Sequence, residues 1–288
     1  MAKLEIHFGD NLEVLAALPD KSVRLVYIDP PYNTGKVMRR HEIEIQRQGD
    51  GPGHLGFEDQ RYKSVRVGTM SFSDIFQDDE YLLFLEERLV QIRRILTDDG
   101  SLFFHIGGPQ SHYCKILLDA VFGRDSFMNE IVWAWDYGAR TKKRWPSKHD
   151  VIFWYVKNPK KYVFELDECD RIPYLSPLLV GTEKAARGKT PTDTWWHTIV
   201  SPQSFEKTGY PSQKPLGILE RIVKVHSKPG DLLCDVFAGS GSFGEAATKN
   251  DRDCLLADNN RQAMIVMEKR FRKQAVTWKG WVPKTPVD

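Results

Sequence analysis

Short apolar runs alternate with longer amphipathic segments along most of this chain. Strands are predicted at residues 4–8, 23–28, 101–106, 151–156, 232–236 and 254–257. Apolar residues spaced close to a 3.6-residue period predict helices at residues 11–18, 79–96, 111–122, 216–225, 243–249 and 260–273. Nearly continuous apolar strands separated by helices are typical of a mostly parallel sheet with helices on both faces. The predicted fold class is therefore α/β, with a doubly wound, mostly parallel sheet.

Two segments interrupt this alternation. Residues 36–69 are polar, rich in glycine and charge, and show no sustained period, so we expect a long loop there. Residues 157–210 are irregular and are expected to form an insert on the α/β core. A chain of 288 residues suits one large domain, or one domain with such an insert.

Composition and cysteine spacing exclude several classes of protein. No stretch approaches 18 uncharged apolar residues and no signal-peptide pattern opens the chain, so we expect neither a membrane span nor export. The cysteines are scattered and form no CxxC pair, which argues against a zinc site or a disulfide framework. We therefore expect reduced thiols, no bound metal and a cytoplasmic location. The cysteines are Cys114, Cys169, Cys234 and Cys254.

A glycine-rich motif lies in "GDLLCDVFAGSGSFG", residues 230–244. A predicted strand leads into Gly239, Gly241 and Gly244, which have the spacing G-x-G-x-x-G, and a helix follows. Such glycines allow a tight turn and close approach of a ligand to the backbone, and the helix N-terminus offers free N–H groups. Asp258, at the end of the next strand, is placed to bind ribose hydroxyls. The pattern predicts an adenosine-containing cofactor.

Three interpretations of this motif remain. A dinucleotide such as NAD is the obvious candidate, and a glycine-rich turn without a ligand is the plainest one. S-adenosylmethionine is favoured by Asp235, because a carboxylate before the loop suits an amino group and would repel a pyrophosphate. The position of the motif near the end of the sequence also leaves little chain for the rest of a dehydrogenase.

A second motif, Asp-Pro-Pro-Tyr at residues 29–32, ends the strand in "VRLVYIDPPYNTG". Ligands of doubly wound sheets bind beyond the carboxyl ends of the strands, where Asp29 lies. The Asp29 carboxylate and the Pro30 carbonyl offer two acceptors to an exocyclic amine, on a backbone that the prolines stiffen. Tyr32 can stack on a base, which reaches such a pocket only after it is flipped out of a duplex. The alternative is a solvated Asp in a proline-rich turn.

With both motifs the sequence resembles the beta class of amino-group DNA methyltransferases over nearly its whole length. "GDNLEVLAALPDKSVRLVYIDPPYNTG" is similar to the N-terminal block of that family. "TGYPSQKPLGILERIV" and "PGDLLCDVFAGSGSFGEAA" are similar to its C-terminal block, and "HDVIFWYVKN" resembles the block that precedes target recognition. The catalytic motif comes first and the cofactor glycines come last, as in the beta arrangement. The resemblance implies a Rossmann-like methyltransferase fold, S-adenosyl-L-methionine as cofactor and double-stranded DNA as partner.

The resemblance also implies a set of site residues. The catalytic motif would be Asp29, Pro30, Pro31 and Tyr32. The cofactor-binding residues would be Asp235, Phe237, Ala238, Gly239, Ser240 and Gly241 towards the methionine, Asp258 and Asn259 towards the ribose, Gln213, Lys214 and Pro215 towards the carboxylate, and Asp10 and Asn11 beside the adenine. The implied organisation is a catalytic part at 1–156, a target-recognition insert at 157–210, a cofactor-binding part at 211–276 and a tail at 277–288.

Two departures from the family pattern lie beside the cofactor motif. Asp-Val-Phe at 235–237 replaces the common Asp-Pro-Phe, and Gly-Ser-Gly-Ser-Phe at 239–243 replaces the common Gly-Ser-Gly-Thr-Thr. We expect Val236 to matter little and Phe243 to alter the first helical turn near the cofactor.

Several further residues have two interpretations each. A basic stretch beside the catalytic end either contacts DNA phosphates or is a solvated face. Trp195, Trp196 and His197 are expected to pack as a small core rather than to contact DNA, and His105 to be a core histidine rather than a base. Residues 36–69 would be a lid or a DNA-embracing loop, or disordered without DNA. The basic residues are Arg140, Lys142, Lys143, Arg144 and Lys148.

The predicted function is methyl transfer from S-adenosylmethionine to N6 of adenine in a specific DNA sequence. N4 of cytosine is the runner-up, and adenine is preferred because the family tends to have Ser in place of Asp29 in the cytosine enzymes. A DNA-binding module without activity and an RNA or protein-glutamine methyltransferase are further alternatives, although Asn commonly replaces Asp29 in the latter group. Homodimers are common in the class, and no feature of the sequence proves one.

Overall fold

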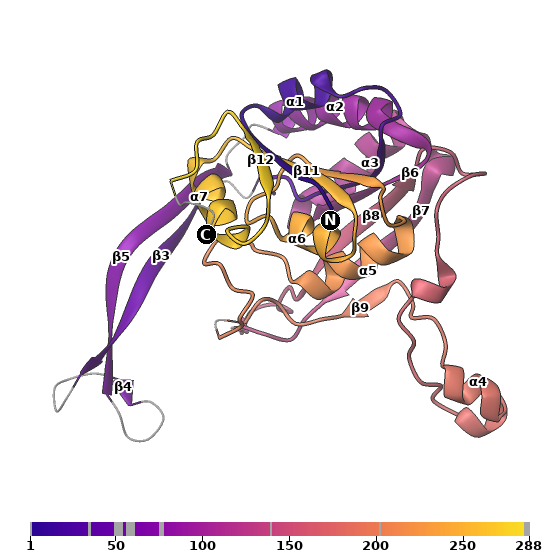
Figure 1. The fold of residues 1–288 in the computed structure, drawn as a ribbon. Coiled ribbons are helices and arrows are strands. Elements are labelled where there is room, and N and C mark those ends of the chain that lie inside the picture. Colours follow the sequence, from indigo (N-terminus) through magenta and orange to yellow (C-terminus); the bar gives the residue numbers. More distant parts are fainter. Residues whose placement is uncertain are drawn as a thin grey trace.

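The computed structural model describes residues 2–33, 36–48, 54–55, 61–74, 78–138, 140–201 and 203–284. Within these ranges the central element is a nine-stranded sheet (Figure 1). Its strands are, in spatial order, β12 (Val276–Lys279), β1 (Leu4–Phe8), β11 (Asp253–Asp258), β10 (Leu232–Asp235), β2 (Val23–Ile28), β6 (Leu96–Ile106), β8 (His149–Val156), β7 (Phe127–Ala134) and β9 (Thr194–Trp196). The strands from β12 to β6 run parallel, and β8 is antiparallel to both of its neighbours. The predicted α/β class is confirmed.

Helices cover both faces of the sheet. One layer is formed by α1 (Asn11–Ala17), α2 (Asp78–Ile95) and α3 (Ser111–Phe122), and the other by α5 (Leu216–His226), α6 (Ser242–Lys249) and α7 (Arg261–Arg270). Along β2, Val26 and Ile28 pack with the first layer, whereas Leu25 and Tyr27 pack with the second. Burial on both faces explains why the apolar run of this strand is almost continuous.

Three strands of the sheet, β7, β9 and β12, were not predicted. The polar pair Asn129–Glu130 interrupts the apolar pattern of β7, and β12 includes residues 277–279 of the predicted tail. β6 also begins earlier than predicted, at Leu96, because Leu96 pairs with Val23 of the neighbouring strand β2. These strands are defined by pairing with neighbours, which a local sequence pattern does not report.

The prediction of a loop over residues 36–69 is wrong. β3 (Lys36–Gln48) and β5 (Arg61–Asp74) form a long antiparallel hairpin, with β4 (His54–Leu55) paired to β5. The hairpin projects from the body of the molecule in Figure 1. Parts of both strands do alternate apolar and polar residues, as in residues 42–46 and 69–73, and this local signal was outweighed by the glycine and charge of the segment as a whole.

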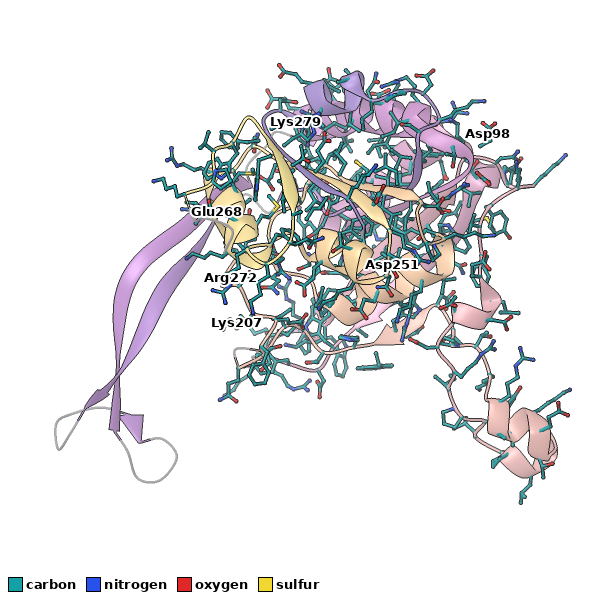
Figure 2. The ribbon with its side chains drawn as sticks, viewed as in Figure 1. Asp98, Lys207, Asp251, Glu268, Arg272 and Lys279 are labelled. Carbon is teal, nitrogen blue, oxygen red and sulfur yellow. The ribbon has the colours of Figure 1, made fainter. Side chains whose placement is uncertain are left out.

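The segment predicted as an irregular insert, residues 157–210, is largely irregular in the structure. Its helix α4 (Thr182–Arg187) lies on an arm that projects away from the body (Figures 1 and 2). Its strand β9 returns to the sheet and pairs with β7. The two tryptophans of β9 differ in burial. Trp195 is buried with its ring against the Arg221 guanidinium, 4.7 Å away, whereas Trp196 is 72% exposed. The prediction of a core position therefore holds for Trp195 and not for Trp196.

Candidate active site

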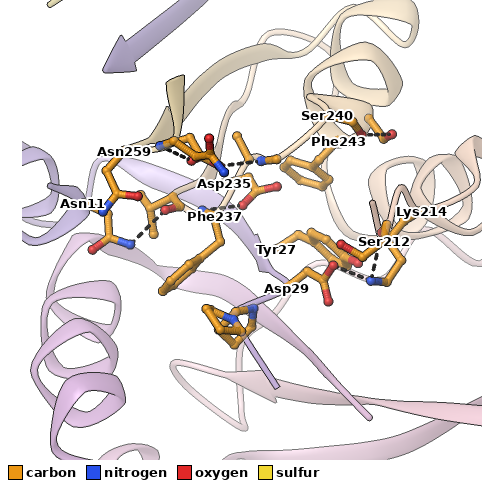
Figure 3. Close-up of a pocket in the computed structure, with 18 of the residues that line it drawn as sticks. Asn11, Tyr27, Asp29, Ser212, Lys214, Asp235, Phe237, Ser240, Phe243 and Asn259 are labelled. Atoms are coloured by element: carbon orange, nitrogen blue, oxygen red, sulfur yellow. Dashed lines mark hydrogen bonds and ion pairs between the residues drawn. The ribbon is translucent and has the colours of Figure 1, made fainter. Parts of the chain in front are cut away.

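A pocket of about 590 Å³ opens at the carboxyl ends of β2, β10 and β11 (Figure 3). This volume lies in the range of small-molecule and cofactor sites. The predicted catalytic and cofactor residues line it, with two exceptions. They are brought together because β2 and β10, which are far apart in the sequence, are neighbours in the sheet. Ligands of doubly wound folds bind at such an edge.

The exceptions are Pro215 and Gly241, which do not line the pocket. Pro215 stands immediately before α5, and Gly241 stands immediately before α6 with φ +75°. A Cβ atom at Gly241 would lie 2.9 Å from both Met267 Cγ and Phe271 Cε2 of the α7 region. Gly241 therefore lets the loop pack closely on the core, and its expected contact with a cofactor stays a prediction.

The Asp-Pro-Pro-Tyr motif begins directly after β2. The Tyr32 hydroxyl donates to Asp29 Oδ1 at 2.9 Å, and the Tyr81 hydroxyl of α2 donates to the Pro31 carbonyl at 2.6 Å. The second hydrogen bond fixes the turn that the prolines stiffen. Burial, together with the charges of Asp29 and Asp150, raises the pKa of Tyr32 well above its usual value, so its hydroxyl remains a donor.

Lys214 lies against the catalytic motif. Its ammonium forms an ion pair with Asp29 Oδ2 and a hydrogen bond of 3.3 Å with the Ser212 carbonyl (Figure 3). It also lies 5.3 Å from the centre of the Tyr32 ring. The resemblance places this lysine at the carboxylate of the cofactor. The structure brings it to the catalytic aspartate within the same pocket, and its contact with the cofactor carboxylate stays a prediction.

Two further carboxylates face the pocket. The amides of Gly239 and Asn260 donate to the two oxygens of Asp258, each at 2.8 Å, and the Phe237 amide donates to Asp235 Oδ1 at 2.9 Å. Burial raises the pKa of Asp258 to about 6. Burial, followed by the charges of Asp29 and Asp258, raises the pKa of Asp235 well above its usual value. Carboxylates held in this way are stabilised by a cationic ligand.

Arg88 is a pocket residue that the sequence patterns did not identify. Its Nε donates to Asn11 Oδ1 at 2.6 Å, and its guanidinium lies 3.7 Å from the centre of the Phe84 ring. Asn11 donates in turn to the Val236 carbonyl at 3.0 Å, which joins α1 to the end of β10. The sequence did contain one signal for Arg88. It directly precedes Leu89 on the buried side of α2, where a charged side chain is unusual.

Two stacked aromatic rings line part of the pocket. Phe243, in the first turn of α6, stacks on Tyr27 at 5.3 Å between ring centres, and both rings are buried. Phe243 therefore packs inward beside the site. The Tyr27 hydroxyl lies 2.7 Å from His105 Nδ1, and His105 Nε2 lies 3.4 Å from Asp150 Oδ2. His105 is a buried, hydrogen-bonded histidine, as predicted.

A family model described as DNA methylase, of the N6/N4 type, matches residues 23–269, which include both motifs and the carboxyl ends of β2, β10 and β11. The chain belongs to the DNA methylase family. It is a DNA methyltransferase that uses S-adenosylmethionine.

One relative and two solved structures illustrate what this chain is similar to. The DNA adenine methyltransferase YhdJ of Escherichia coli (strain K12) is 27% identical to the methyltransferase over 274 residues, which cover 91% of this chain and 80% of the relative. The solved structure of the cytosine-N4-specific PvuII DNA methyltransferase superposes with a TM-score of 0.63 and 16% identity, over 92% of this chain and 85% of that one. A modification methylase of Thermus thermophilus, TTHA0409, solved with S-adenosylmethionine, gives a TM-score of 0.56 at 21% identity, over 97% and 99% of the two chains.

The predicted basic stretch of the methyltransferase connects β7 to β8 at the pocket edge of the sheet. Arg140 forms an ion pair with Asp136, and Lys148 Nζ donates to the Tyr137 carbonyl at 2.7 Å. The other three side chains, Lys142, Lys143 and Arg144, are exposed. The stretch thus lies at the same edge of the sheet as the catalytic motif.

Clusters of metal-binding side chains and membrane-spanning helices are both absent from the described residues. No group of three or more side chains there is arranged to hold a metal ion. No described helix has the length and apolar character that crossing a membrane would need.

Proposed function

We propose that this methyltransferase transfers the methyl group to N6 of adenine in double-stranded DNA. The observation that carries the proposal is the position of the Asp29 carboxylate, with Tyr32 beside it, at the mouth of the cofactor pocket. A carboxylate accepts an amine N–H strongly, and in this family the adenine enzymes tend to have Asp at this position. The relative YhdJ, named as an adenine methyltransferase, supports the same base.

The residues of the pocket fit S-adenosylmethionine. The cofactor carries a sulfonium and an ammonium group, and Asp235 is a buried carboxylate that favours a cation. Gly239, at φ +49°, lets the Tyr210 ring approach the loop closely, because a Cβ atom there would lie 3.0 Å from that ring. When bound, S-adenosylmethionine supplies the electrophilic methyl group. We assign its methionine part to Asp235 and its adenosine part to Asp258 and Asn11.

The chain itself provides the acceptors for the target base. In this proposal Asp29 and the Pro30 carbonyl accept the two N–H groups of the exocyclic amine, which directs the nitrogen lone pair towards the pocket. The hydrogen bond from Tyr81 to Pro31 keeps the turn in place while the base enters. Tyr32 stacks on the flipped base, an interaction worth about 1–3 kcal/mol. The proton of the amine leaves afterwards to Asp29 or to water.

The basic stretch and the hairpin are proposed to hold the duplex. Lys142, Lys143 and Arg144 lie at the same edge as the catalytic motif, where flipping would bring the phosphates of the target strand. The β3–β5 hairpin projects from the residues that follow Tyr32, and we assign it to the DNA-embracing role expected for residues 36–69.

N4 of cytosine is the second candidate. It is favoured by the PvuII enzyme, which is cytosine-N4-specific and gives a TM-score of 0.63. Both bases present an exocyclic amine, so the same pocket chemistry serves either of them.

Product analysis tests the proposal. DNA methylated with labelled cofactor is digested to nucleosides and separated by mass, with the Asp29→Ala variant as the control for background activity. We expect the label in N6-methyladenine and none in the control, while the variant keeps its cofactor affinity within a few-fold. Label in N4-methylcytosine would overturn the base assignment, and an active Asp29→Ala variant would overturn the role of Asp29.

A further inference from the structure

A second carboxylate lies next to the Asp-Pro-Pro-Tyr motif, and the proposed methyl transfer gives it no role. Asp150, near the start of β8, has its Oδ2 atom 3.4 Å from the Tyr32 hydroxyl and 3.4 Å from His105 Nε2. Its side chain is 17% exposed. The Tyr32 hydroxyl therefore lies within hydrogen-bond distance of two carboxylates, that of Asp29 at 2.9 Å and that of Asp150.

The backbone around Asp150 leaves room for this arrangement. A Cβ atom at Gly107, just after β6, would lie 2.3 Å from Asp150 Oδ1 and 2.8 Å from Tyr32 Cε2. Any side chain at that position would separate the carboxylate from the tyrosine ring. The contact therefore depends on a glycine at the end of the strand next to β2.

The donors that already bind Asp29 explain why a second acceptor for the Tyr32 hydroxyl matters. A tyrosine hydroxyl donates one hydrogen bond, and here it donates to Asp29 Oδ1 while Lys214 takes Asp29 Oδ2. Both oxygens of the catalytic carboxylate are thus engaged before a base arrives. Each carboxylate oxygen has two lone pairs, so an arriving amine shares Asp29 with these donors and meets a weaker acceptor, and the hydroxyl can relieve this by rotating its proton away.

We propose that Asp150 is a positioning residue that accepts the Tyr32 hydroxyl when the target amine binds Asp29. The hydroxyl proton turns from Asp29 to Asp150, no covalent bond is made or broken, and Oδ1 of Asp29 is left to the amine alone as a stronger acceptor. The inference rests on the proposed role of Asp29 and holds for adenine and cytosine alike.

The surroundings keep Asp150 in the form of an acceptor. Burial alone would raise its pKa, but the hydrogen bond and charge of His105, with the charge of Lys214, lower it below the usual value. The other nitrogen of His105, Nδ1, lies 2.7 Å from the Tyr27 hydroxyl, so the imidazole is held between Tyr27 and Asp150. The groups that face Asp150 are Tyr32, His105 and, at longer range, Lys214.

A double-mutant cycle tests the proposal on the full-length enzyme. Asp150→Asn keeps the size of the side chain and leaves a weaker, neutral acceptor, so the hydroxyl stays on Asp29. We expect the single-turnover methylation rate to fall about tenfold, the difference between a charged and a neutral hydrogen bond. In the Tyr32→Phe background, which has no hydroxyl to move, Asp150→Asn should cause no further loss, and the affinity for S-adenosylmethionine should stay within a few-fold in every variant.

A matched control lies elsewhere in the fold. Asp119 of α3 is a carboxylate of similar exposure, 20%, that also accepts a tyrosine hydroxyl, from Tyr155 at 2.6 Å, and it does not line the pocket. Asp119→Asn should lower the free energy of unfolding without changing the methylation rate. This control variant measures the effect of losing an Asp–Tyr hydrogen bond that lies outside the pocket.

The outcomes are distinct. An unchanged rate in Asp150→Asn, or an equal loss in the wild-type and Tyr32→Phe backgrounds, would overturn the inference, because Asp150 would then act independently of the hydroxyl. Product analysis of the same reactions identifies the methylated base. A cytosine product would therefore overturn the base assignment while leaving the result of the double-mutant cycle unchanged.

Discussion

Lys214 and Asp29 form an ion pair between residues 185 positions apart in the sequence. Their side chains are only 9% and 15% exposed. Asp29 follows β2, whereas Lys214 belongs to the segment before α5, so the pair joins the catalytic turn to the cofactor-binding half of the chain.

The first prediction concerns the stability of this pair. Lys214→Met leaves the Asp29 carboxylate without its cation and should lower the free energy of unfolding by about 2 kcal/mol or more. Asp29→Asn combined with Lys214→Met should recover much of that loss, because no buried charge remains. Urea unfolding of the two single variants and the double variant measures the coupling. Additive losses would show that the pair has no net effect on folding.

The second prediction is a pH dependence at Asp258. The folded-state pKa is raised from 3.8 to about 6, so the stability that this group contributes is present below pH 4 and is lost as the pH rises through 6. Asp258→Asn removes the ionisation. Relative to the wild type, its free energy of unfolding should therefore improve by at most about 3 kcal/mol between pH 4 and pH 7.

The carboxylate of Asp258 lines the pocket and keeps some exposure, which makes this value an upper limit. Unfolding of the cofactor-free protein at several pH values gives the measurement. Parallel curves for the two proteins would mean that Asp258 titrates in the folded state as it does in the unfolded chain.

The third prediction separates two glycines of one motif. Gly239→Val adds a side chain beside Tyr210 in the pocket and should weaken S-adenosylmethionine binding about tenfold or more. Gly241→Ala adds a Cβ atom against Met267 and Phe271, at a left-handed φ of +75°, and should lower stability by about 1–3 kcal/mol. Calorimetry of cofactor binding and thermal unfolding distinguish the two effects. The assignment fails if Gly239→Val binds the cofactor normally.

The fourth prediction concerns the basic stretch. Neutralising Lys142, Lys143 and Arg144 together should weaken binding to any duplex and lower the salt slope by about 0.9 for each lost phosphate contact. Binding is measured over a series of salt concentrations. The matched control neutralises three exposed lysines at the opposite edge of the sheet, Lys21, Lys160 and Lys161. Equal slopes for the two triple variants would make the stretch an ordinary solvated face.

Local patterns in the sequence determined much of this protein. Buried strands and amphipathic helices carry their own periods, so the α/β fold and most helix positions could be predicted. Asp29 and Gly239 were found because each lies at a strand end followed by a turn of unusual composition, and such turns report local backbone constraints.

The tertiary structure decided which distant residues meet. No periodicity links Asp29 to Lys214, Arg88 to Asn11, or Asp150 to Tyr32, since these contacts arise only when strand order places β2 between β10 and β6 and brings β8 beside β6. The pairing of β3 with β5 was likewise not predicted, although parts of both strands alternate apolar and polar residues. A strand is stabilised by hydrogen bonds to its partner, and the identity of that partner is a property of the whole fold.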